Sequence, residues 1–158
     1  MDILRYEGDL HALLKWAVNR VESVDTYKTL PAPPEGFIDW VTALMPENCR
    51  ETLGHWISSH TADSPHDGEW ARGYPHNHIT SVGWDPDATT VLTYLITESQ
   101  GGEIAVGGLN KDDPYEIIAP EPGMAVRVDA RTWHGVRAVR GGGRIALGTT
   151  GFPSTSEL

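Results

Sequence analysis

The sequence predicts a mainly β domain, a β-sandwich or barrel, preceded by a helical first third. Beyond Tyr74 the apolar period changes to two, and the apolar segments are rich in β-branched residues. Gly/Pro turns separate these segments at short intervals, while apolar residues before them recur at helical spacing. A chain of 158 residues fits a single domain spanning 1–158, with helical support over about 1–60 and a β core over about 74–151.

The first third is expected to form two or three helices. Asp9 is a favoured N-cap residue type at the start of the first apolar repeat. The apolar spacing predicts helices in this order: one over about 10–21, one marked by Phe37, Trp40, Val41 and Leu44 that ends near Pro46, and one over about 47–58 with Leu53, Trp56 and Ile57 as its apolar face.

The β half is expected to consist of short strands joined by turns. Strand-forming composition predicts strands over about 90–97, 103–106, 115–118, 124–128, 133–139 and 144–150. Turns are expected at 100–102, at 120–123 and at the three glycines 141–143.

Composition narrows the class of protein. The formal charge of −10 argues against nucleic-acid binding, which needs a basic surface over phosphates. No segment approaches the ~20 apolar residues of a membrane span, and the start of the chain does not resemble a signal peptide. Cys49 is the only cysteine, so no internal disulfide is expected. These features lead us to expect a cytoplasmic protein without a membrane or nucleic-acid partner.

Three histidines are spaced as metal ligands. His76 and His78 are two residues apart and would point to the same face of a strand. His134, from a distant strand, would complete a half-shell of three imidazoles around a divalent metal. The alternative is that His76 and His78 are two polar residues on a solvated strand face.

The pattern from residue 74 to residue 151 resembles the Fe(II)/2-oxoglutarate-dependent dioxygenases, the double-stranded β-helix family that includes prolyl hydroxylases. The resemblance depends on an ordered set of features rather than on any one of them. They are His76-Asn77-His78 where the family has His-x-Asp, Leu92-Thr93-Tyr94-Leu95 followed by Gly101-Gly102-Glu103-Ile104, the Pro120-Glu121-Pro122-Gly123 turn, and His134 with Arg144 ten residues later.

The resemblance implies a fold, a cofactor and a cosubstrate. The fold would be a jelly roll with two or three N-terminal helices packed outside. His76, His78 and His134 would bind Fe(II), and Arg144 would bind the far carboxylate of 2-oxoglutarate. Tyr94 is either a core residue or a cosubstrate contact. The expected activity is oxidation of a small molecule with O₂; the oligomeric state is left open.

The chain departs from the family pattern at two positions. His78 stands in place of the acid, and Ala146 stands where the family often has the serine of Arg-x-Ser. Three histidines also resemble the cupin-type thiol dioxygenases, which do not use 2-oxoglutarate. Zinc held by three histidines and a non-catalytic, ligand-binding β-helix are the other readings.

The geometry of Arg144 depends on the three preceding glycines. If Gly141, Gly142 and Gly143 close a hairpin, Arg144 pairs with a residue about five positions along the strand from His134. At ~3.3 Å per residue the separation is on the order of 16 Å. A metal-chelating diacid plus an extended guanidinium spans a similar length. The face on which Arg144 lies would depend on the loop length.

Overall fold

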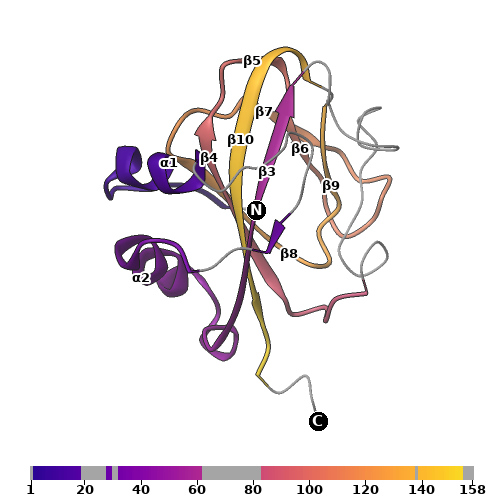
Figure 1. Cartoon of the computed structure of the whole chain (residues 1–158). Helices are drawn as coiled ribbons and strands as arrows, with labels where there is room; N and C mark the ends of the chain where they lie inside the picture. The colour runs from indigo at the N-terminus through magenta and orange to yellow at the C-terminus, as the bar shows by residue number, and fades with distance from the viewer. Residues whose placement is uncertain (1, 19–27, 30–31, 62–82, 138, 155–158) are drawn as a thin grey trace.

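The computed structural model describes residues 2–18, 28–29, 32–61, 83–137 and 139–154 (Figure 1). Two antiparallel sheets form the body, and two helices pack against one of them. The elements in chain order are β1 Asp2–Arg5, α1 Leu10–Val18, β2 Lys28–Thr29, α2 Glu35–Leu44, the 3₁₀ turn η1 Glu47–Cys49, β3 Thr52–Thr61, β4 Thr89–Ile96, β5 Ser99–Gly101, β6 Ile104–Val106, β7 Glu116–Ile118, β8 Met124–Asp129, β9 His134–Val136 and β10 Val139–Phe152.

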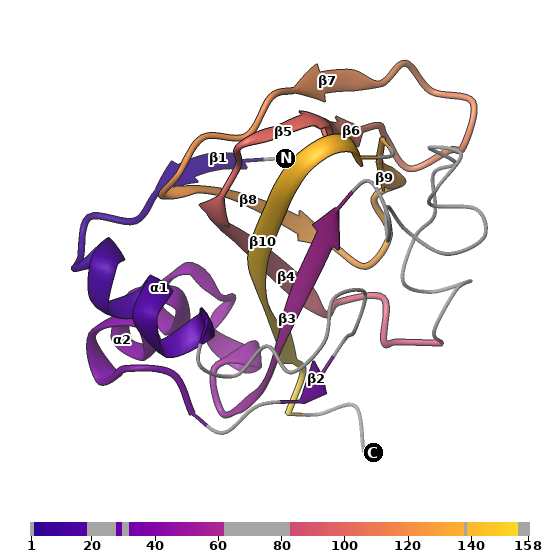
Figure 2. The same cartoon turned by 45° about the horizontal axis from the view of Figure 1, so that its top comes forward.

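Among the described residues, the larger sheet has the strand order β1-β8-β4-β10-β3-β2, and β5 pairs with the N-terminal part of β10. The smaller sheet has the order β7-β6-β9. The helices lie on one side of the larger sheet, and β6 and β9 lie on the other (Figures 1 and 2). We call these two sides of the larger sheet the outer face and the inner face. This arrangement confirms the predicted jelly roll with external helices.

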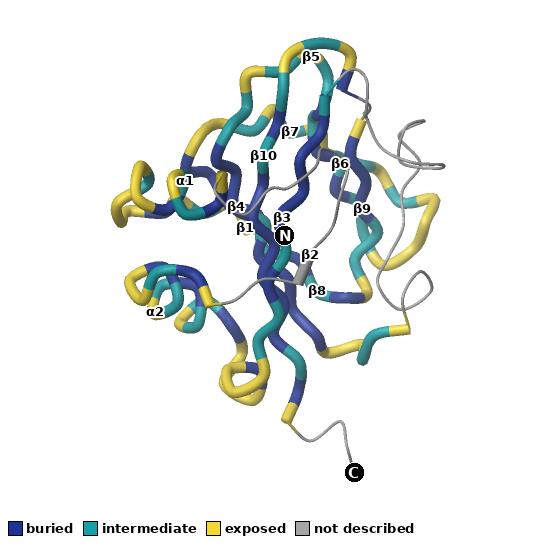
Figure 3. Tube along the Cα trace, in the orientation of Figure 1, coloured by how far each residue is buried: buried dark blue, intermediate teal, exposed yellow. Residues whose placement is uncertain are grey.

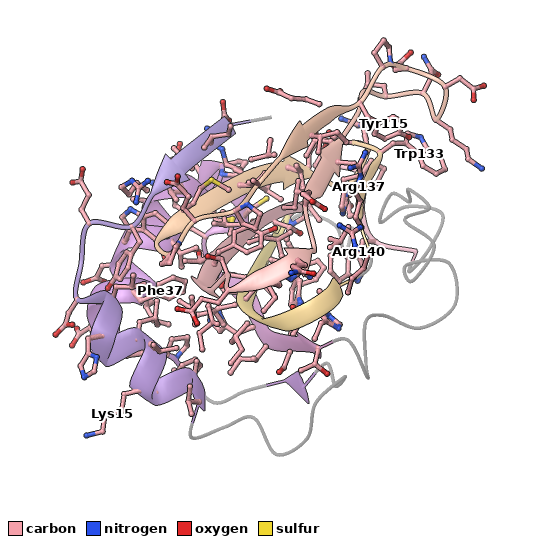
Figure 4. The ribbon with its side chains drawn as sticks, turned by 90° about the horizontal axis from the view of Figure 1, so that it is seen from above. Lys15, Phe37, Tyr115, Trp133, Arg137 and Arg140 are labelled. Atoms are coloured by element: carbon pink, nitrogen blue, oxygen red, sulfur yellow. The ribbon has the colours of Figure 1, made fainter. Side chains whose placement is uncertain are left out.

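The two predicted helices form for local reasons that the sequence contains. The Asp9 carboxylate accepts a hydrogen bond from the Ala12 amide at 3.0 Å, which satisfies one of the open amides of the first turn of α1. Helix α2 begins after Pro34 and ends before Pro46, which cannot continue a helix. Lys15 points to solvent, whereas Phe37 points to the sheet (Figure 4). No helix in the described part of the chain is long and apolar enough to cross a membrane.

The outer face carries the main apolar core. An edge-to-face pair joins Tyr6 and Phe37 at 5.6 Å, and a second joins Tyr6 and Trp40 at 5.0 Å. Such pairs contribute about 0.5–1.5 kcal/mol beyond the area they bury. The fully buried members of this core include Leu13, Ala17, Phe37, Val41, Cys49, Val91, Ala125 and Leu147. The helices are therefore held by their buried stripe and expose the remainder of their surface (Figure 3).

Strand β10 is buried on both faces. Leu147 belongs to the outer core, whereas its neighbour Ala146 packs in a second cluster between the two sheets. Strand β3 pairs with β10, and its residues alternate between the outer and inner faces in step with those of β10. His55, on the outer face, shares a 2.9 Å hydrogen bond with Thr149. The inner cluster comprises Tyr94, Ile104, Val106, Met124, Val126, Val128, Val136 and Ala146.

The predicted third helix is wrong: its residues form the η1 turn and strand β3. Leu53, Trp56 and Ile57 matched helical spacing, but a strand that is buried on both faces shows no clean alternation of apolar and polar residues. Trp56 lies on the inner face and Ile57 on the outer face. The sequence also gave no sign of β1, which pairs with β8 at the sheet edge.

The hairpin expected at the three glycines is also wrong. The chain runs through Gly141, Gly142 and Gly143 within β10, which pairs there with β5. Gly142 has φ +69°, and a Cβ at this position would overlap the carbonyl oxygen of Glu98. The glycines therefore allow β10 to bend while staying paired, instead of reversing it.

Replacing Gly142 with Ala is expected to destabilise the protein more than replacing Gly83 with Ala. Gly83 also has φ +69° but has open space around its Cβ position, so Gly83→Ala reports the backbone strain alone, about 1–2 kcal/mol. Gly142→Ala adds the overlap with Glu98 and should cost about 1–3 kcal/mol more. Urea unfolding of both variants measures the difference, and equal losses would contradict the close approach of β5.

Candidate active site

His134 lies at the start of β9 and is 5% exposed. Its Nδ1 lies 2.9 Å from the carbonyl oxygen of Thr132, which can only accept a hydrogen bond. Nδ1 therefore carries the ring proton and donates it, and the lone pair of the neutral ring is on Nε2. A metal-binding histidine is commonly fixed by this type of hydrogen bond from its other ring nitrogen.

A tight turn before β9 positions this histidine. The Asp129 carboxylate oxygen accepts hydrogen bonds from the amides of Arg131 and Thr132 at 3.0 Å and from the Thr132 hydroxyl at 2.9 Å. An aspartate that bonds its following backbone in this way favours a turn over a continued strand. The turn presents the Thr132 carbonyl to the imidazole, so the side chain of Asp129 acts on His134 through Thr132.

Burial also sets the charge of His134. Removal from water lowers the pKa of the imidazole, and the opposing effects of the Thr132 hydrogen bond and the Asp129 charge are smaller. The ring is therefore neutral near pH 7, which is the form that can donate a lone pair to a metal.

Arg144 lies on β10 and is 3% exposed. Its Nη1 donates a hydrogen bond to the Gly102 carbonyl at 3.0 Å. The guanidinium carbon lies 5.9 Å from the centre of the Tyr94 ring, within the range of a cation–π contact. These two contacts orient the buried guanidinium inside the jelly roll.

His134 and Arg144 face the same space between the sheets. His134 pairs across the smaller sheet with Val106, and Val106 packs in the inner cluster. Arg144 precedes Ala146 by two residues on β10, so it shares the inner face with Ala146 and Tyr94. The structure thus brings an imidazole from one sheet and a guanidinium from the other to one interior.

The other arginines of the C-terminal third lie outside this interior. Arg127 donates to Asp2 and to the Leu44 carbonyl, and Arg131 pairs with Asp87 at 3.2 Å. Arg137 and Arg140 are exposed at the surface (Figure 4). Of these five arginines, Arg144 alone is buried.

The remaining predicted residues divide into two groups. Tyr94 is fully buried in the inner cluster and also contacts Arg144. It is therefore a core residue that lies next to the candidate site. His76 and His78 lie outside the described residues. Within the described residues no group of three His, Cys, Asp or Glu side chains is close enough to hold a metal.

Two inner-face residues of β3 were not singled out from the sequence. His60 pairs directly with Arg144, and Ser58 pairs with Ala146. His60 is 1% exposed and Ser58 is 5% exposed. Because β3 was taken for a helix, its period of two was not sought. The sequence holds only a weak signal for them: Ser58 and His60 are polar residues two apart, as on one face of a strand.

Comparison with solved structures agrees with the fold. A Pseudomonas putida prolyl-4-hydroxylase superposes with a TM-score of 0.70 at 12% identity, covering 96% of this chain and 91% of that chain. A 2OG-Fe(II) oxygenase family oxidoreductase from Burkholderia pseudomallei gives a TM-score of 0.63 at 16% identity, covering 96% of this chain and 87% of that chain. A Trichoplax adhaerens prolyl hydroxylase, solved with a hypoxia inducible factor peptide fragment, gives a TM-score of 0.65 at 13% identity, covering 96% of this chain and 83% of that chain. The chain therefore has the fold of these oxygenases.

Comparison of sequences gives no such match. No protein-family model matches the chain, and no curated protein matches it. The likeness is therefore one of fold, and the roles of individual residues have to be argued from the site itself.

We expect His134→Ala to lose the metal. The variant removes the Nε2 lone pair that the Thr132 hydrogen bond fixes, and the remaining ligands would hold iron weakly. Metal analysis after anaerobic loading with Fe(II) should give one iron per wild-type chain and much less in the variant. His55→Ala is the control, because His55 is a buried histidine on the outer face. Full iron content in His134→Ala would remove His134 from the metal site.

Proposed function

We propose that this chain is a non-haem Fe(II)-dependent oxygenase that uses O₂ and 2-oxoglutarate to oxidise a small molecule. The observation that carries the proposal is the burial of His134 and Arg144 in one interior of a jelly roll. A neutral imidazole suits a divalent metal, and a fixed guanidinium suits a carboxylate. The fold shared with 2OG-Fe(II) oxygenases supports the same conclusion.

In this proposal His76, His78 and His134 hold the iron. Bound ferrous iron would supply the activation of O₂ that couples decarboxylation of 2-oxoglutarate to oxidation of the substrate. The contribution of His134 is a lone pair on Nε2 in a ring that stays neutral and cannot rotate. Val106 lies opposite His134 on β6, and Val136 lies two residues further along β9, so buried apolar residues neighbour this histidine on the smaller sheet.

Arg144 would bind the far carboxylate of 2-oxoglutarate. An arginine presents its N–H groups in a rigid fork that matches the two oxygens of a carboxylate. The Gly102 hydrogen bond and the Tyr94 ring fix the direction of that fork before any ligand arrives. Tyr94 would then act as a wall of the cosubstrate site as well as a core residue.

The substrate we propose is a compact molecule. The connection between β6 and β7 folds on itself: the Tyr115 hydroxyl donates to the Lys111 carbonyl at 2.8 Å, and the Asp113 carboxylate accepts from the Asn110 amide at 3.1 Å. Such a loop is short and internally bonded, and it does not extend an arm that would grip a long partner. The Trichoplax structure holds a peptide fragment, so a peptide is the alternative that a substrate screen has to include.

Anaerobic titration of the Fe(II) protein with 2-oxoglutarate tests the proposal as a whole. Chelation of iron by 2-oxoglutarate should give a metal-to-ligand charge-transfer band that saturates at one equivalent per iron. A cupin-type three-histidine dioxygenase would bind iron and show no such band at saturating 2-oxoglutarate. A ligand-binding jelly roll would in addition consume no O₂ with any substrate.

We expect Arg144→Lys to weaken 2-oxoglutarate binding and to leave iron binding unchanged. Lysine keeps the charge but loses the fork, and a buried charged pair that loses its geometry costs about 2 kcal/mol or more, which is about 30-fold in affinity. Arg140→Lys is the control, because Arg140 is an exposed arginine on the same strand. The charge-transfer band measures the 2-oxoglutarate affinity of each protein, and metal analysis measures its iron content. Equal values for wild type and Arg144→Lys would exclude Arg144 from the cosubstrate site.

We expect His78→Ala to bind iron poorly and His78→Asp to retain it. His78 shares a strand spacing with His76 and occupies the position of the family's acid, and aspartate is itself a ligand for ferrous iron. His11→Ala is the control, since His11 is an exposed histidine of α1 without a partner at ligand spacing in the sequence. Iron content and the charge-transfer band are the readouts. Wild-type iron affinity in His78→Ala would show that His78 is not a ligand.

A further inference from the structure

We propose that strand β3 supplies the second half of the carboxylate site: Ser58 and His60 donate hydrogen bonds to the same far carboxylate that Arg144 binds. This inference rests on the proposed use of 2-oxoglutarate and assigns two further positioning residues to it. Both residues lie in a segment whose role the sequence pattern does not indicate.

The register of β3 against β10 places these residues beside Arg144. Arg144 is directly opposite His60, and Ala146 is directly opposite Ser58. Directly opposed residues of an antiparallel pair have Cβ atoms about 4.5–5.5 Å apart and lie on one face. His60 and Ser58 therefore lie on the inner face beside the strand position of Arg144, on the side of β3, while the guanidinium itself contacts the Tyr94 ring on the side of β4.

Contacts on both sides of the sheet confirm which face these residues occupy. His55 bonds Thr149 on the outer face, and Ile57 packs with Leu147 in the outer core. One position further along, the Trp56 indole lies across Gly148, where a Cβ would collide with it. The residues with even numbers on both strands are therefore on the inner face, and Ser58 and His60 are among them.

The chemistry of a buried carboxylate explains why these residues matter. A carboxylate has about four lone-pair sites, and a bidentate arginine satisfies two of them. Acceptors left without a donor in a buried site cost about 1–3 kcal/mol, so further donors are needed. Ala146 offers only a methyl group, whereas Ser58 across the strand pair offers a hydroxyl and His60 offers a ring N–H.

The sizes of the side chains on the inner face agree with this assignment. Ser58 and Ala146 form a pair of small side chains next to the Arg144–His60 pair, and the Trp56 indole covers the following pair at Gly148. A ligand carboxylate at Arg144 would thus be bordered by small side chains with one hydroxyl. In this chain the hydroxyl comes from the strand that neighbours the arginine, and not from the arginine's own strand.

Ser58→Ala is expected to weaken 2-oxoglutarate binding to the iron-loaded protein about tenfold, because a hydrogen bond to a charged group is lost. Ser59→Ala is a matched control: it makes the same change at a buried serine one residue away on the outer face. Ser59→Ala should stay within about twofold of wild type. The charge-transfer titration measures both affinities, and thermal unfolding verifies that both variants are folded.

A rescue variant separates hydrogen bonding from damage to the fold. Ser58→Ala combined with Ala146→Ser moves the hydroxyl across the strand pair while keeping the same atoms between the strands. The double variant should recover affinity to within about threefold of wild type, whereas a purely structural role for Ser58 gives no recovery. No recovery in the double variant would overturn the proposal even if Ser58→Ala itself folds poorly.

His60 is tested with a pair of substitutions of similar size. His60→Gln keeps an N–H donor and should stay within about threefold of wild type, while His60→Phe removes it and should lose about tenfold. Equal affinities for both variants and wild type would remove His60 from the site. If the wild-type iron protein itself binds no 2-oxoglutarate, the proposed function fails first. If it binds and Ser58→Ala binds equally well, the failure is of the β3 assignment alone.

Discussion

The register of β10 is the constraint on which the rest of the molecule depends. This strand separates two environments, so residues that are adjacent in sequence perform different tasks: Leu147 fills the outer core while Arg144 and Ala146 face the inner space. A slip of one residue would turn every side chain to the other face. It would place the guanidinium under the helices and a leucine in the site. The extensive pairing of β10 with β3 on one side and β4 on the other makes such a slip costly.

The sequence predicted the β half of the fold well because its strands carry strong local signals. The run of β-branched and aromatic residues in β4 strongly favours a strand, and the Pro-Gly pair before β8 strongly favours a turn. Strand β3 was missed for a physical reason: Trp56 is half-buried on the inner face and Ile57 is buried on the outer face, and the spacing of these residues with Leu53 matches that of a helix. The glycines before Arg144 were misread because glycine permits both a turn and a bent strand, and only the approach of β5 decides between them.

The candidate site could be predicted in part because its members stand in a recognisable order. His134 and Arg144 were found by their spacing, and the structure places both in the same interior. The hydrogen bond from His134 to Thr132 and the turn held by Asp129 could not be predicted from spacing, since they depend on a carboxylate that bonds its own backbone. Ser58 and His60 required the register of a strand whose existence was not predicted.

The outer face of the larger sheet carries the main apolar core, and the inner face carries the residues of the candidate site. On the outer face, side chains such as Leu147, Val91 and Phe37 are fully buried, and each contributes about 1.5–3 kcal/mol by leaving water. On the inner face, His60, Ser58 and Arg144 are polar groups whose burial has to be compensated by hydrogen bonds. Substitutions on the outer face should therefore lower the free energy of unfolding. The inner face also carries the apolar cluster around Tyr94 and Val126, so only substitutions of its polar residues are expected, under the proposed function, to act mainly on ligand binding.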